Sequence, residues 1–239
     1  MELATVRSIV ILTGAGISAE SGLATFRGPD GLWEGHRVED VCTPEALARN
    51  AALVHRFYDE RRARLQDVKP NAAHEALAAL DAQWPGELLI VTQNVDDLHE
   101  RAGARRLIHM HGELLSALCG HCGIPRRWTG ALRPGTSCQE CGHGPLRPDI
   151  VFFGEIPYEM EAIDQALRRC DLFVSIGSSG AVYPAAGFVQ TASHLGASTL
   201  ELNLEPSAGS IYFDESRIGK ASKLVPELVL SLLARDGAA

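Results

Sequence analysis

The sequence lacks any apolar run long enough to cross a membrane. The longest, such as Ile9–Leu12 and Leu88–Val91, are far shorter than the roughly 20 residues that a spanning helix needs. The N-terminal segment Met1–Arg7 has neither the basic start nor the apolar stretch of a secretory signal. We therefore expect a cytoplasmic protein without a membrane partner. Internal repeats and low-complexity tracts are also absent.

Basic residues are in the minority. The chain has 22 Lys and Arg against 30 Asp and Glu, a formal net charge of -8. This balance repels phosphate backbones, so no nucleic-acid partner is expected. The length of 239 residues suits one large α/β domain, alone or with a small insertion, and is short for two full-sized domains.

Six cysteines in a chain without a secretory signal favour metal binding or burial over disulfides. Four of them form two C-x2-C pairs with the spacing of a tetrahedral thiolate zinc site: Cys119, Cys122, Cys138 and Cys141. Four thiolates leave no open coordination position, so the zinc is expected to be structural and to supply folding free energy to a small module. Two disulfides or four free thiols are the alternative. Cys42 and Cys170 lie outside the pattern and are expected to be small buried residues.

Short β-rich runs alternate with helical patterns along the chain. The strands are expected at Ser8–Thr13, Glu87–Thr92, Asp171–Ile176 and Ser198–Asn203. The helices are expected at about Pro44–Gln66, Ala72–Ala82, Tyr158–Arg169, Ala185–Leu195 and Val225–Leu233, with Thr43 and Asn71 as caps. This alternation predicts the α/β class: a Rossmann-type doubly wound parallel sheet with an inserted zinc-ribbon module and a helical and loop insertion.

The first strand runs into Gly14-Ala15-Gly16-Ile17-Ser18-Ala19, which matches G-x-G-x-x-G/A at a strand-to-helix turn. Such a turn accepts the pyrophosphate of a dinucleotide, although a glycine turn also serves merely to pack a helix on a strand. A dehydrogenase would carry an acidic strand end about 20 residues later. A loop rich in Gly and Pro occupies that region, at Gly28–Asp40, and Asn203-Leu204-Glu205 is the first such acidic tip, which argues against hydride transfer.

Polar residues follow the second predicted strand. Gln93, Asn94 and Asp96 stand at its carboxyl end, where open α/β sheets bind ligands, although Asn and Asp also cap helices. His109 and His111 precede the cysteine-rich module, and a histidine is suited to general base catalysis near neutral pH. Spacing alone does not select His111 over His109 or His99.

Together these segments resemble the sirtuin family. The matches run in family order from about residue 8 to 221. They comprise Gly14–Gly22, Thr25–Gly28, Thr92–Asp96, His111-Gly112, the two cysteine pairs, Val151–Glu155, Gly177–Ser179, Val182–Ala185 and Asn203–Glu205.

The resemblance implies an NAD-dependent protein-lysine deacylase with NAD as co-substrate and acyl-lysine proteins as partners. In the implied reaction the acyl oxygen attacks the nicotinamide ribose and releases nicotinamide, and His111 as general base activates a ribose hydroxyl against the resulting imidate carbon. Water completes the cycle, giving free lysine and O-acyl-ADP-ribose.

The resemblance also assigns residues to roles. Catalysis falls to His111 and Asn94. Cofactor binding falls to Gly14, Ala15, Gly16, Ile17, Ala19, Glu20, Phe26, Arg27, Trp33, Gln93, Asn94, Val95, Asp96, Gly177, Ser178, Ser179, Asn203, Leu204, Glu205 and Ala221. Substrate binding falls to Tyr58, Arg61, Phe153, Gly154, Glu155 and Val182. The implied domains are a Rossmann-type NAD-binding domain of residues 1–28, 72–111 and 149–239, a cofactor loop and helical module of 29–71, and a zinc-binding module of 112–148.

Tyr58 and Arg61 are three apart on one predicted helix face. They resemble the Tyr-x-x-Arg pair of the subgroup that removes acidic acyl groups, so desuccinylase and demalonylase activity is expected beside deacetylation. A guanidinium and a phenol bind a carboxylate by charge-assisted hydrogen bonds. The alternative is a solvated basic face, since Arg56, Arg62 and Arg64 lie nearby.

Two departures from the family pattern occur, Leu23-Ala24-Thr25 before Phe26 and Ser178 in place of threonine. The main rival function is a mono-ADP-ribosyltransferase at the same NAD site. A zinc-ribbon adaptor without enzymatic activity is a second, which the acidic balance and the strand-tip cluster disfavour. The protein is expected to be a monomer.

Overall fold

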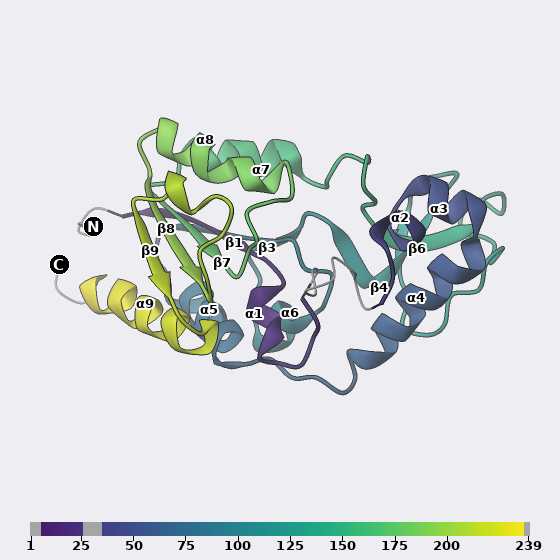
Figure 1. Ribbon diagram of the computed structural model, residues 1–239, viewed down its shortest axis with the longest axis horizontal. Coiled ribbons are helices and arrows are strands. Elements are labelled where there is room, and N and C mark those ends of the chain that lie inside the picture. Colours follow the sequence, from purple (N-terminus) through teal and green to yellow (C-terminus); the bar gives the residue numbers. More distant parts are fainter. Residues whose placement is uncertain (1–5, 26–34, 237–239) are drawn as a thin grey trace.

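The computed structural model describes residues 6–25 and 35–236. Its larger part is built around a six-stranded parallel sheet (Figure 1). The strand order is β3-β2-β1-β7-β8-β9, and every neighbouring pair is parallel. The strands are β1 (Ser8–Thr13), β2 (Glu87–Thr92), β3 (Leu107–His109), β7 (Leu172–Ile176), β8 (Ser198–Asn203) and β9 (Glu215–Ile218). The predicted doubly wound α/β fold is confirmed.

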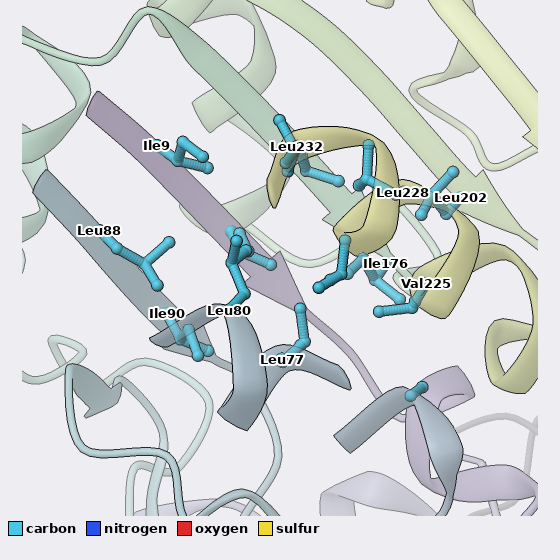
Figure 2. Close-up of a cluster of buried hydrophobic side chains, with 14 of the residues drawn as sticks. Ile9, Leu77, Leu80, Leu88, Ile90, Ile176, Leu202, Val225, Leu228 and Leu232 are labelled. Atoms are coloured by element: carbon cyan, nitrogen blue, oxygen red, sulfur yellow. The ribbon is translucent and has the colours of Figure 1, made fainter. Parts of the chain in front are cut away.

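Helices cover both faces of this sheet (Figure 1). On one face lie α5 (Ala72–Gln83) and α9 (Ala221–Asp236), and on the other α7 (Met160–Leu167) and α8 (Phe188–His194). Ile9 and Ile11 of β1 pack with α5 and α9, whereas Val10 and Leu12 pack with α7 and α8. Figure 2 shows the first cluster, in which leucines of α5 and α9 meet strand side chains. Burial on both faces explains why β1, β2 and β7 are largely apolar runs.

A second, three-stranded antiparallel sheet has the order β5-β4-β6. Its strands are β4 (Gly112–Cys119), β5 (Pro125–Arg127) and β6 (Leu146–Ile150), and the helices α2 (Val38–Val41), α3 (Pro44–Arg49) and α4 (Ala51–Arg64) lie beside it (Figure 1). Val54, Tyr58, Leu114 and Phe152 are buried together between α4 and this sheet.

The single helix predicted over Pro44–Gln66 is wrong, because the chain breaks at Asn50. This residue has φ -149° and ψ 69°, and its side chain accepts a hydrogen bond from the Leu53 amide at 3.1 Å. Asparagine competes for backbone amides in this way, which makes it a good N-cap and a poor helix-interior residue. The caps predicted at Thr43 and Asn71 are confirmed.

Several short elements were not expected. Two edge strands, β3 and β9, and the helix α6 (Leu98–Ala102) fall in segments without clear periodicity, whereas the helix expected after the glycine turn is present as α1 (Gly16–Ala19). The 3-10 turns η1 (Ala185–Gly187) and η2 (Ser210–Tyr212) accompany α8 and β9. The predicted loop Gly28–Asp40 lies partly outside the described residues, and α2 occupies its end. None of the described helices combines the length and apolarity required to cross a membrane.

Candidate active site

A cleft of about 670 Å³ lies where the carboxyl ends of the parallel strands meet the second sheet and its helices. The turn after β1, the tip after β2 and the ends of β7 and β8 supply one wall, and segments from α4, β4 and β6 supply the other. Of the predicted site residues, these line the cleft: Gly14, Ala15, Gly16, Ala19, Glu20, Arg61, Gln93, Asn94, Val95, Asp96, His111, Phe153, Gly154, Glu155, Gly177, Ser178, Ser179, Val182, Asn203, Leu204, Glu205 and Ala221.

The glycine turn is tied to the neighbouring strand end. The amides of Gly14 and Gly16 donate to the carbonyls of Ile176 and Gly177, both at 2.9 Å. A Cβ on Gly16 would stand 2.7 Å from the Gly177 Cα, so no larger residue fits without backbone movement. Close packing of the turn against Gly177 is therefore enough to explain both glycines, as the alternative of a turn that only packs a helix on a strand proposes. The turn still forms the floor of the cleft, but α1 is a single turn rather than the longer helix typical of dinucleotide folds.

Asn94 and Asp96 are joined through a residue that sequence analysis did not single out. The side-chain amide of Asn94 donates to the Ser18 hydroxyl at 3.1 Å, and this hydroxyl donates to Asp96 Oδ2 at 3.0 Å. Asp96 Oδ1 accepts from the Leu98 amide at 3.1 Å, at the start of α6, whose N-cap residue is Asp97. Burial raises the pKa of Asp96, and the Leu98 and Ser18 hydrogen bonds oppose that rise. The result is a rigid polar corner, since every member of the chain is hydrogen bonded.

His111 is held in one tautomer. Its Nδ1 lies 3.2 Å from the Gln93 carbonyl oxygen, which only accepts, so Nδ1 carries the proton and Nε2 keeps a free lone pair. Burial lowers the pKa of His111 below its ordinary value of 6.5, against the opposing effect of the Gln93 bond. The ring is therefore neutral at pH 7, which is the state that a general base needs.

The structure distinguishes His111 from the other histidines nearby. His99 is 1% exposed with Nε2 3.0 Å from the Thr13 hydroxyl, and burial lowers its pKa to about 3. His74 is fully buried below the Ser18 hydroxyl, and burial lowers its pKa to about 4. His109 bonds Asn94 and Glu100. Only His111 of these four is part of the cleft wall.

The predicted acyl-group residues divide between the wall and the core. Arg61 lines the cleft, and its guanidinium carbon lies 5.4 Å from the centre of the Phe57 ring. Tyr58 is fully buried beside the thiol of Cys42, which does line the cleft. Arg62, the next residue, is 2% exposed and donates to the Leu114 carbonyl at 2.6 Å. A uniformly solvated basic face is therefore wrong for this helix.

The predicted substrate-binding residues Phe153, Gly154, Glu155 and Val182 all line the cleft. Phe153 and Tyr183 also line the cleft and are 42% and 73% exposed. The Glu155 carboxylate, by contrast, accepts from the Phe152 amide at 2.8 Å and pairs with Arg147 at 2.9 Å. Glu155 thus shapes its own turn, and its side chain is not free for a substrate.

The four cysteines form one cluster outside the cleft, with all Sγ atoms within 4.8 Å of one another. Cys119 and Cys141 have their Sγ atoms 3.7 Å apart, and Cys122 and Cys138 3.9 Å. Tetrahedral ligands about 2.3 Å from an ion stand about 3.8 Å apart, so the arrangement fits a bound metal ion. All six cysteines are free thiols, so the disulfide alternative is not supported.

Comparison with known proteins shows which family, sequence relatives and solved structures the chain resembles. The model of the Sir2 family matches residues 14–184. An NAD-dependent protein deacylase of Yersinia pseudotuberculosis is 56% identical over 232 residues, covering 96% of this chain and 84% of the relative. A Sir2 homolog solved with NAD superimposes with a TM-score of 0.88 at 36% identity, covering 99% and 92% of the two chains. A Sir2 complex with a p53 peptide and NAD+ gives 0.79 at 28% identity, covering 98% and 95%.

The chain belongs to the Sir2 family. The prediction of a sirtuin, and of an enzyme of that family, is thereby confirmed.

Some residues assigned to this sirtuin's site are not found on the cleft wall. The Ile17 side chain is fully buried in the core beneath α5 and α9, because it points from α1 toward the sheet rather than the cleft. Tyr58 is buried behind the wall, as described above. Phe26, Arg27 and Trp33 lie outside the described residues.

Three cleft features of the sirtuin were missed. Ser18 stood inside the quoted glycine motif, but its link to Asn94 and Asp96 depends on tertiary packing. Cys42 was expected to be a buried apolar residue, and although it is 4% exposed it also borders the cleft. The Glu20 carboxylate accepts from the amide and hydroxyl of Ser222, tying the turn to α9, and no local pattern signals this contact.

Proposed function

We propose that this sirtuin removes acyl groups from protein lysine with NAD as co-substrate, and that it accepts succinyl and malonyl groups as well as acetyl. One observation carries the proposal: a guanidinium, Arg61, borders the same cleft as His111, Asn94 and Asp96. The family relatives named NAD-dependent protein deacylase and the neighbour solved with NAD support the common reaction.

Cleft residues of suitable chemistry are available for each part of NAD. The Asn94, Ser18 and Asp96 corner offers an amide, a hydroxyl and a carboxylate for the nicotinamide and its ribose. Asn203, at the end of β8, donates to the Ser178 carbonyl at 2.9 Å and stands with Glu205 at the proposed adenosine end. NAD supplies an electrophilic ribose carbon to the acyl oxygen of the lysine.

His111 is the proposed general base. Its Nδ1–H donates to the Gln93 carbonyl, so Nε2 is the atom that takes a proton from a ribose hydroxyl. Asn94 and Asp96, which line the same cleft, are only 8% and 6% exposed.

Arg61 is the proposed anchor for an acidic acyl group. Its positive charge lies in a partly enclosed cleft lined by the apolar Leu114, Ile150 and Phe152, where charge pairing is less screened than in water. Tyr58 lies behind this region, beside the Cys42 thiol. A terminal carboxylate would gain a charge-assisted bond that an acetyl methyl does not form.

The test compares acetyl-, succinyl- and malonyl-lysine peptides of one sequence with wild type, Arg61→Met and Arg56→Met. Arg56 is exposed on the same helix and is the matched control. Arg61→Met should lower kcat/KM for the two acidic acyl groups by about tenfold or more and spare the acetyl peptide. Equal losses on all three peptides would remove Arg61 from acyl recognition.

No observation favours the mono-ADP-ribosyltransferase. It would leave label from adenine-labelled NAD on protein, whereas the proposed reaction leaves it in a small acyl-ADP-ribose.

We propose that the cysteine cluster holds zinc. Its Sγ spacings suit a tetrahedral ion, and four thiolates suit zinc in particular. Bound zinc would cross-link β4 to the loop that carries Cys138 and Cys141, and its role would be structural because the cluster lies outside the cleft. The domain boundaries given above, a cytoplasmic location, a monomeric state and the absence of nucleic-acid partners also stand as proposals.

A further inference from the structure

Four consecutive backbone carbonyls at the tip of β2, those of residues 92–95, each accept a hydrogen bond from a donor within residues 109–114. The Thr92 carbonyl accepts from the Met110 amide at 3.1 Å, and the Val95 carbonyl accepts from the Leu114 amide at 2.8 Å. Between them, the Gln93 and Asn94 carbonyls are held by histidine rings rather than by amides. The tip that carries Asn94 and Asp96 is therefore positioned in part by two side chains.

The two rings differ in what faces their second nitrogen. His111 uses Nδ1 on the Gln93 carbonyl, and no described group bonds its Nε2. His109 uses Nδ1 on the Asn94 carbonyl at 3.1 Å, and its Nε2 lies 2.7 Å from Glu100 Oε1. A carbonyl and a carboxylate both accept, so two N–H donors satisfy them only when the His109 ring carries both protons.

We infer that His109 is a positioning residue: an imidazolium held by Glu100 that clamps the Asn94 carbonyl and so sets the nicotinamide end of the NAD site. The inference rests on the proposed function. It assigns different charge states to two histidines between β3 and β4. His109 is a cation that positions the site, and His111 is a neutral base.

The surroundings of His109 support a cation. Glu100 on α6, Glu113 on β4 and Asp96 at the tip are the carboxylates facing it, and His99 on α6 is the nearby titratable base. Burial alone would lower the pKa of His109, but the Glu100 bond and the charges of Glu100 and Glu113 raise it above 6.5. His99 is too deeply buried to compete for the proton, as its pKa is lowered to about 3.

The pH dependence has a definite sign. A raised pKa means that the clamp is intact at lower pH and is lost as the pH rises through the pKa of His109. We therefore expect the KM for NAD to increase on the alkaline side, while the acidic limb of kcat belongs to His111. Asparagine places its amide nitrogen near the Nδ1 position without titrating, so His109→Asn keeps the Asn94 bond and abolishes the alkaline rise.

The first measurement is ¹⁵N NMR of the histidine rings in the wild-type protein without NAD or peptide. Both His109 nitrogens should be protonated at pH 7, and His111 should be neutral with its proton on Nδ1. Glu100→Gln should shift the His109 titration to lower pH. A neutral His109 at pH 7 would overturn the inference, and this readout does not depend on the reaction that the enzyme catalyses.

The second measurement separates clamping from folding. His109→Ala should raise the KM and Kd for NAD by about tenfold, the cost of losing a charge-assisted bond, with a smaller change in kcat. His109→Asn should restore most of the affinity, and His109→Gln should not, because its amide reaches the Nε2 position. His194→Asn, at an exposed histidine that also bonds a carbonyl through Nδ1, is the control and should match wild type.

Two outcomes contradict the clamp: unchanged NAD affinity in His109→Ala, or equal impairment of His109→Asn and His109→Ala at matched thermal stability. The Kd for NAD is measured calorimetrically without acyl peptide. A wild-type enzyme that binds NAD but leaves acyl-lysine intact would therefore refute the proposed function while the clamp remained under test.

Discussion

Replacing Arg62 with methionine should destabilise the fold while leaving the acyl end of the cleft intact. Arg62 lies between α4 and the cysteine-containing sheet and is 2% exposed. Its Nε donates to the Leu114 carbonyl at 2.6 Å, and its terminal nitrogen pairs with Asp59. The Asp59 carboxylate in turn accepts from the Leu132 amide at 2.9 and 3.0 Å, so one ion pair joins the helix to two parts of the module.

The magnitude follows from the partners left behind. Methionine fills much of the volume but leaves a partly buried carboxylate without its cation, and removing one partner of a buried pair costs about 3–5 kcal/mol. The Leu132 bonds keep Asp59 partly satisfied, so we expect the lower end, about 3 kcal/mol. For a chain of this size that lowers Tm by about 6–12 °C.

The assay is thermal unfolding followed by circular dichroism, with urea unfolding as a second measure. Arg56→Met changes an exposed arginine on the same helix and should stay within about 0.5 kcal/mol of wild type. At a temperature where Arg62→Met remains folded, its ratio of succinyl to acetyl activity should equal that of wild type. Melting at the wild-type temperature, or a selective loss of succinyl activity, would refute this division of roles between Arg61 and Arg62.

Three further predictions concern the turn, the metal and the base. Gly16→Ala should weaken NAD binding in calorimetry, because its Cβ would stand 2.7 Å from the Gly177 Cα; wild-type affinity would show that the strand ends separate freely. Cys119→Ser should lose zinc, measured by atomic emission, and lower Tm together, and an unchanged melting curve in the zinc-free variant would exclude a structural ion. The pKa of His111 lies below 6.5, so kcat should fall only as the pH drops through that lower value, and an acidic limb above pH 6.5 in the pH–rate profile would contradict a buried neutral base.

Local patterns predicted the central strands well. β1, β2 and β8 begin and end at the expected residues, because β1 and β2 are largely apolar runs and all three are mostly buried and bounded by a turn. β7 begins at Leu172, one residue later than predicted, although the Asp171 backbone still bonds Ser8 and Ser198 and its carboxylate accepts from the amides of Arg7 and Ser8. The edge strand β9, Glu215–Ile218, half exposed and largely polar, carries no such signal.

The cysteine site was predictable because its information is local. Two C-x2-C pairs bring ligands together through short turns, and the cluster follows from the spacing once the pairs meet.

The choice among histidines and arginines was not local. His99, His109 and His111 are equivalent as sequence, and only the sheet and its connections bury the first, place the second on Glu100 and leave the third in the cleft. Arg61 and Arg62 are neighbours on one helix that point into different surroundings. Such assignments require the tertiary contacts of both partners.

The most direct test of the account follows both products of one reaction. Wild-type protein, NAD and a succinyl-lysine peptide are incubated, and nicotinamide and free-lysine peptide are quantified together by mass spectrometry, with His111→Ala in parallel. The account predicts that the two products appear in equal amounts, only with NAD present, and that His111→Ala forms little free-lysine peptide. Unmodified succinyl-lysine beside released nicotinamide, or full activity of His111→Ala, would contradict it.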